Sequence, residues 1–339
     1  MVSSARVELY EVEKSIQQAY VRGSGTEHLL TRKNKVAESI CPESSELIKK
    51  YLNQMLPIVK TIKISSSVLQ ESDQLNLDLL SNQITKLEFE EAKRYVQELL
   101  DVDLTGVDMQ LTSVGDVMVE GMCLPCSNES HIVLIPENSH EVSSTDLLVH
   151  ELGHAAEFTI ARSYEDDKLL VPHASFSETV AYYCQLKYLK EKGTKEQRIG
   201  AFGAFYLTYL TACVVRHCLN DSIELLALKP NKALKSGYYD DILGAYPKSG
   251  INEAKKIVIS NIKFFQEHYG SLIKLMHGDF SPRLGFIFAL FLLDKPIGVL
   301  QDLITKNSLQ NDFFTVSQTI VPDLKSYSEL DNVLLSFYG

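Results

Sequence analysis

The stretch LLVHELGHAAEF, residues 147–158, restricts the local fold more than any other part of the chain. Two histidines stand four residues apart, and a glutamate directly follows the first. On an α-helix, positions four apart lie one turn apart on the same face, so His150 and His154 can place both imidazoles on one ion. Glu151 is rotated by about 100 degrees, where its carboxylate can reach a water beside that ion. The alternative is an ordinary amphipathic helix whose polar residues have no joint role.

The residues around this stretch favour a helix that packs closely on a neighbour. The cap candidates and the early aspartate of SSTD, at 143–146, predict a helix over 145–161. Gly153 lowers helix stability by up to about 1 kcal/mol, which indicates that another backbone approaches it closely. A separate stripe is suited to packing and consists of Leu148, Leu152, Ala155 and Thr159. This separation of faces favours the metal-binding interpretation.

A catalytic zinc site needs three protein ligands and an open position for water, so a third ligand must come from another segment. The candidate is Glu178, which follows His154 by 24 residues. The 13 residues 162–174 are enough for the chain to double back and bring the next helix alongside the first. Two alternatives remain open. Glu178 can instead close a capping box with Ser175 at its own helix start, and the loop residue His173 can coordinate, although a loop histidine is more often solvated.

The size and composition are those of a globular chain that folds without disulfide staples. Its 339 residues, 45% of them hydrophobic and 23% charged, allow one large domain or two ordinary ones. No apolar run approaches the roughly 20 residues that cross a bilayer, and the longest candidate is 284–293. The N-terminus has no basic start followed by an apolar stretch. We expect no membrane partner and a cytoplasmic protein, or one exported without a cleavable signal peptide that acts in a host cytosol.

Charge and cysteine usage narrow the classes of partner and cofactor. The formal net charge of -11 disfavours nucleic acid, because phosphate binding requires concentrated Lys and Arg. The chain has six cysteines, which we expect to be free thiols. CLPC, at 123–126, is the only pair with CxxC spacing, and a zinc knuckle there would need a second ligand pair that is not evident.

The spacing of apolar residues along the sequence predicts a mainly α fold with a small antiparallel or mixed β-sheet. Residues 1–104 are predicted as an N-terminal helical region, and residues 105–339 as the catalytic region. The catalytic region begins with three short strands within 107–136, which are rich in Val and Ile. The helix over 145–161 follows, then a second helix over 176–192 that carries the candidate third ligand. Packed helices continue to the C-terminus.

The phrase HELGHA, followed about 25 residues later by FSET, resembles the gluzincin zinc metallopeptidases. The resemblance is to the oligoendopeptidase F and thimet oligopeptidase family, and it covers the part of the chain from the strand at 131 to Tyr183. It implies a zincin-like fold in the catalytic region. It also implies that His150, His154 and Glu178 are the zinc ligands and that Glu151 is the general base.

The C-terminal part departs from this family. Its members carry a segment rich in His and Tyr that binds substrate and stabilises the oxyanion. The local counterpart is HGDFSPRLGFIFALFLL, which begins at His277 but has Arg283 and Leu284 where tyrosines are expected. We take His277 as the first choice for a catalytic donor and expect at least one of His268, Tyr269, His277 and Arg283 to face the open side of the metal. Tyr246 is a further substitute.

The motif and the resemblance together predict a zinc-dependent endopeptidase with one Zn2+ per chain and a peptide or protein substrate. Hydrolysis would use a metal-activated water with Glu151 as general base. The strand HIVLIPE, at 131–137, is expected to pair with an extended peptide. Both a general peptide trimmer and a dedicated protease, such as a bacterial effector acting inside a host, fit this description. The alternative from another class is a catalytically silent helical interaction protein that retains a structural zinc site.

Overall fold

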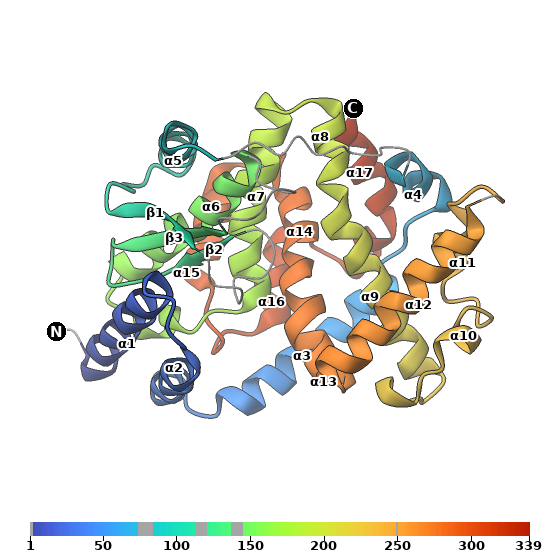
Figure 1. The fold of residues 1–339 in the computed structure, drawn as a ribbon, viewed down its shortest axis with the longest axis horizontal. Coiled ribbons are helices and arrows are strands. Elements are labelled where there is room, and N and C mark those ends of the chain that lie inside the picture. Colours follow the sequence, from blue (N-terminus) through green and yellow to red (C-terminus); the bar gives the residue numbers. More distant parts are fainter. Residues whose placement is uncertain (1–2, 74–83, 113–120, 137–144, 249) are drawn as a thin grey trace.

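Helices build most of this molecule, and a small three-stranded sheet lies at one side of it (Figure 1). The structure is a computed structural model that describes residues 3–73, 84–112, 121–136, 145–248 and 250–339. The predicted fold class, mainly α with a small sheet, is confirmed.

The elements follow one another in three groups. The helices before the sheet are α1 (Ser4–Val21), α2 (Glu27–Ile40), α3 (Ser44–Thr61), α4 (Ser66–Asp73) and α5 (Lys86–Leu100). The sheet and the two helices after it comprise β1 (Val107–Thr112), β2 (Met122–Leu124), β3 (His131–Pro136), α6 (Thr145–Ser163), the short η1 (Asp167–Leu170) and α7 (Ala174–Lys192). The C-terminal part contains α8 (Lys195–Gly200), α9 (Phe202–Asn220), η2 (Leu225–Ala227), α10 (Pro230–Ala233), α11 (Asp240–Gly244), α12 (Ile251–Tyr269), α13 (Leu272–Leu275), the π-helical turn η3 (Met276–Phe280), α14 (Ser281–Leu292), α15 (Ile297–Lys306), α16 (Phe313–Ile320), η4 (Leu324–Glu329) and α17 (Leu330–Tyr338).

The sheet is mixed, with β3 in its centre. β1 pairs with β3 in parallel, with Val107 opposite His131, and β2 pairs with it antiparallel, with Cys123 opposite Val133. β1 pairs with residues 131–136 along one edge of β3, and β2 pairs with residues 132–134 along the other. No edge of 132–134 is therefore free, and the expected pairing with a peptide is wrong for these residues. Residue 137 lies outside the described residues. The continuous apolar run of this strand is typical of a central strand buried on both faces. In the described sheet, β2 occupies an edge instead.

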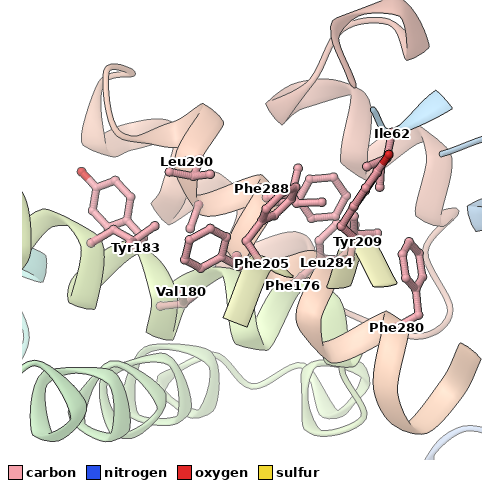
Figure 2. Packing of buried hydrophobic residues seen from close by; sticks show 14 of the residues in the cluster. Ile62, Phe176, Val180, Tyr183, Phe205, Tyr209, Phe280, Leu284, Phe288 and Leu290 are labelled. Carbon is pink, nitrogen blue, oxygen red and sulfur yellow. The ribbon is translucent and has the colours of Figure 1, made fainter. Parts of the chain in front are cut away.

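Helix α7 lies between α6 and α14, and these two contacts are the most extensive between helices in the described chain (Figure 1). Figure 2 shows Phe176 and Val180 of α7 among aromatic side chains of its neighbours, including Phe205 of α9 and Phe288 of α14. All four side chains are fully buried. Burying each such side chain stabilises the fold by roughly 1.5 to 3 kcal/mol, so α7 is fixed firmly in the core.

The predicted division into regions 1–104 and 105–339 stays a prediction. One apolar cluster contains buried residues of both regions, from Cys41 near the N-terminus to Tyr338 near the C-terminus. Helix α1 is also attached to α6, because Arg162 at the end of α6 forms a buried ion pair with Glu13 of α1 at 2.8 Å.

The segment Lys195–Asn220, which spans α8 and α9, is long and apolar enough to cross a membrane by length and composition alone. The sequence-based expectation that no segment reaches this length is therefore wrong for these residues. In the folded chain, 65% of the apolar window is buried inside the protein, as in the core helix of a globular protein.

Candidate metal centre

Helices α6 and α7 bring His150, His154 and Glu178 together. Their ligand atoms all lie within 4.8 Å of one another. His150 Nε2 is 3.4 Å from Glu178 Oε2, and His154 Nε2 is 3.6 Å from Glu178 Oε1. Ligands held tetrahedrally at about 2.1 Å from one zinc are about 3.4 Å apart, so the three side chains fit a zinc ion with little movement. Their side chains are 11%, 14% and 26% exposed, so solvent can reach the cluster.

The residue at which α7 begins shows whether Glu178 caps its own helix or can act as a metal ligand. Helix α7 begins at Ala174, so Glu178 lies in its second turn rather than at its start. Ser175 donates a hydrogen bond to the carbonyl of Ser281 at 2.7 Å and does not cap the helix. The capping box is therefore wrong, and the Glu178 carboxylate is free to face the two histidines.

Two glycines allow the close packing that aligns these helices. A Cβ on Gly153 of α6 would lie 2.8 Å from the Cα of Ala181 in α7. The expectation that a backbone approaches Gly153 closely is thus confirmed. On the other side of α7, a Cβ on Gly285 of α14 would lie 2.5 Å from the Cβ of Glu178 and 2.7 Å from the amide nitrogen of Thr179. Both contacts fix the position of α7, and therefore of Glu178, relative to α6 and α14.

A polar chain orients the first histidine. His150 Nδ1 donates to Gln185 Oε1 at 3.1 Å, and Gln185 Nε2 donates to Asp146 Oδ2 at 2.8 Å. This arrangement places the proton of His150 on Nδ1 and leaves Nε2 free for a metal. The sequence analysis did not single out Gln185 or Asp146.

The charges of the cluster are strongly coupled. Burial alone lowers the pKa of His154, but Glu178, with smaller effects of Glu151 and Glu157, raises it to about 9. Burial likewise favours the neutral form of Glu178, yet His154 and His150 hold its pKa well below the usual range. The metal-free cluster is thus an imidazolium–carboxylate pair. A metal ion that takes this place must displace the proton of His154.

Glu151 lies beside the ligands and against the strand β2. Its side chain is 7% exposed, and a Cβ on Gly121, the residue before β2, would lie 3.2 Å from its Cγ. Any larger residue at 121 would press on Glu151. Burial raises the pKa of the Cys123 thiol on β2, and the nearby carboxylate of Glu151 raises it further. The base candidate is therefore next to β2, one of the two edge strands of the described sheet.

Tyr182 and Arg283 extend the site away from the ligands. Tyr182 lies one turn after Glu178 on α7, and its ring centroid is 4.6 Å from that of His150 in an edge-on arrangement. Arg283 of α14 donates through Nε to Oδ1 of the buried Asp279 at 3.0 Å. Burial alone lowers the pKa of Arg283, but Asp279 and, more weakly, Tyr182 raise it. Arg283 was a candidate from the sequence, whereas Tyr182 was not.

The other C-terminal candidates lie around the π-helical turn η3. The His277 residue is exposed on this turn, although partial desolvation of its ring lowers its pKa below the usual range. Within the described residues, the metal-ligand cluster includes His150, His154 and Glu178 but not His277. His268 stacks on Phe264, and Tyr269 packs against Gly278 of the turn. The role of His277 stays a prediction.

Three further residues noted in the sequence are His173, Cys123 and Cys126. His173 is 1% exposed and surrounded by aromatic rings, among them Tyr51 and Phe313, so the expectation of a solvated loop histidine is wrong. It lies outside the ligand cluster. Cys123 and Cys126 are free thiols, as expected.

Comparisons with known proteins give weak similarities only. No protein-family model and no curated protein matches the sequence. The solved structure of CHT is 12% identical with a TM-score of 0.47, and the match covers 100% of this chain and 80% of that one. PZ peptidase A with an inhibitor is 14% identical with a TM-score of 0.49, over 96% of this chain and 66% of that one.

A protein assigned as an oligoendopeptidase F from Bacillus anthracis strain Ames is 13% identical with a TM-score of 0.43, over 92% of this chain and 60% of that one. The chain thus spans less than two thirds of the length of either peptidase. One of the two has the family name that the sequence motif suggests. All three TM-scores are below 0.5.

Proposed function

We propose that this chain is a zinc-dependent endopeptidase with one zinc ion held by His150, His154 and Glu178. The convergence of these three side chains carries the proposal. They come from two helices, and their separations of 3.4 and 3.6 Å match the ligand spacing of tetrahedral zinc. Three protein ligands leave a fourth position for water or substrate, which is the arrangement of a catalytic rather than a structural zinc site.

When bound, zinc would polarise a substrate carbonyl and increase the acidity of a water molecule. The chain itself must then move protons. Glu151 directly follows a ligand and lies beside the site, so its carboxylate takes the proton of the attacking water and passes it to the leaving amine. Gln185 keeps His150 in the tautomer that presents Nε2.

The strand β2 is the proposed binding edge for the substrate backbone. It is an edge strand of the described sheet, and strand addition gives affinity through main-chain hydrogen bonds without reading side chains. Gly121, directly before β2, lies against Glu151. A peptide paired with β2 would therefore pass close to the base.

Charge that develops on the carbonyl oxygen needs a donor besides zinc, and such a donor is worth about a hundredfold to a thousandfold in rate. His277 was the first choice from the sequence. Among the described residues, Tyr182 is a further candidate because its ring contacts that of His150, and Arg283 stays a candidate from the sequence.

The proposal is tested by incubating the purified chain with casein and with a library of quenched peptides, before and after chelation, and after zinc is returned. We expect one zinc per chain and hydrolysis that chelator removes and zinc restores. Glu151→Gln is the matched control for a contaminating protease. A chain that binds no zinc would refute the proposal. Stoichiometric zinc without hydrolysis of any peptide would support the catalytically silent interaction protein instead.

A further inference from the structure

A buried carboxylate that is not a metal ligand lies next to the cluster. Glu157 follows His154 by three residues on α6, so both side chains lie on the same face of the helix. It is 2% exposed. Acidic residues are almost never fully buried unless they are paired, so this position requires an explanation.

Glu157 connects three segments at the level of the ligands. Its Oε1 accepts hydrogen bonds from Ser177 Oγ at 2.9 Å and from Asn307 Nδ2 at 2.8 Å. Ser177 directly precedes Glu178, and Asn307 directly follows α15. Asn307 Oδ1 also accepts from the backbone N–H of His173, at the start of α7, at 2.9 Å. The carboxylate therefore holds the first turn of α7 against α6.

These hydrogen bonds do not account for the negative charge. A glutamine at this position could accept the same two bonds through its own Oε1. The second oxygen, Oε2, is buried and has no hydrogen-bond partner in the described structure. Burial raises the pKa of Glu157. His154 and the hydrogen bonds from Ser177 and Asn307 lower it and so offset part of this increase. An ionised carboxylate at this depth requires a positive group nearby, and His154 of the ligand cluster is the main group that counteracts the effect of burial on Glu157.

We propose that Glu157 is a positioning residue of the metal centre, whose buried charge favours the bound zinc ion and whose hydrogen bonds fix Glu178 relative to His154. This inference rests on the proposed function. Zinc with one carboxylate ligand retains an excess positive charge, and Glu157 offsets it from the second layer around the ion. Such outer groups typically change metal affinity by about 10- to 100-fold.

Glu157→Gln is the decisive variant because it keeps the hydrogen-bond acceptor and the shape but removes the charge. We expect zinc affinity, measured by competition with a chromophoric chelator, to fall 10- to 100-fold. The melting temperature of the metal-free variant should be equal to or above that of the wild type, since a buried charge has been removed. Glu157→Asp, which keeps the charge, should retain more zinc affinity than Glu157→Gln and serves if the latter does not fold.

Glu13→Gln provides the matched control. Glu13 is also 2% exposed, but its partners are Arg162 at the end of α6 and Lys33 of α2. The same substitution there should lower the melting temperature of the metal-free chain and change zinc affinity less than twofold.

The possible outcomes distinguish a failure of this inference from a failure of the proposed function. Unchanged zinc affinity in Glu157→Gln would overturn the inference while the proposed function stands. A loss of affinity accompanied by a drop in metal-free melting temperature like that of Glu13→Gln would also overturn it, because Glu157 would then be only structural. A wild-type chain that binds no zinc would refute the proposed function, and the inference with it.

Discussion

Gly285→Ala tests whether the contact between α14 and α7 sets the position of Glu178. A Cβ at this position would lie 2.5 Å from the Cβ and 2.8 Å from the carbonyl carbon of Glu178. The first distance is about 1 Å shorter than the roughly 3.5 Å at which carbon atoms pack without repulsion. No side-chain rotation relieves the contact, since its partners are the backbone and the Cβ of Glu178. The two helices must therefore move apart.

The expected change in the free energy of unfolding follows from two opposing effects. Overpacking of a well-packed core costs about 1 to 3 kcal/mol, and a contact with backbone belongs at the upper end of that range. Replacing glycine by alanine in a helix stabilises the helix by up to about 1 kcal/mol. We expect a net loss of about 2 kcal/mol in urea unfolding of the metal-free chain. Gly298→Ala in α15 is the matched control, because no atom lies within 4 Å of its added Cβ, and it should leave stability unchanged or raise it.

The functional result of Gly285→Ala should be larger than its effect on stability. A displacement of about 1 Å at a catalytic group can lower the rate about a hundredfold. Peptide hydrolysis at saturating zinc, measured with a quenched peptide, is the assay. A variant with wild-type stability and wild-type hydrolysis would refute the argument that this helix contact positions Glu178.

Four further results follow from the site. Glu151→Gln should abolish hydrolysis and leave the zinc content unchanged, since glutamine keeps the shape but cannot take a proton; a rate within tenfold of wild type would remove Glu151 from the role of base. Glu178→Ala should lose zinc first, and full occupancy after dialysis against low free zinc would place the third ligand elsewhere. Gln185→Leu should weaken zinc binding by about 10- to 100-fold in chelator competition, because it removes the acceptor of His150; wild-type affinity would show that this hydrogen bond is dispensable. The pKa of His154 in the metal-free chain is raised from 6.5 to about 9, so the folded chain binds more protons than the unfolded chain between these values. Urea unfolding of the metal-free protein should therefore show this pair's stabilisation below pH 6.5 and its loss as the pH rises to about 9, and a flat profile over this window would contradict the pairing.

The sequence was sufficient for the parts of the site that depend on helical spacing. His150 and His154 share a face because they are four residues apart, and residues 145–161 are helical as predicted. The same rule applies to residues that the sequence analysis overlooked. Asp146 precedes His150 by four residues, and Glu157 follows His154 by three. On α7, Tyr182 and Gln185 follow Glu178 by four and seven.

Other features depend on contacts between distant segments and could not be read from local patterns. His173 looks like a loop residue in the sequence, yet Phe313, 140 residues later, covers it in the core. The pairing of β3 on both edges depends on which strands it meets, although its unbroken apolar run was a signal for the central position. The burial of Glu157 depends on Asn307, which lies 150 residues away.

The contact between α14 and α7 also sets an order of events in the synthesis of the chain. Both histidines and Glu178 have been made by residue 178, but the helix that holds Glu178 from the other side begins only at Ser281. A growing chain can therefore contain every ligand while the third is still unsupported. High-affinity metal uptake should be a late event, coupled to completion of the C-terminal helices. We expect a polypeptide cut short before α14 to bind metal weakly.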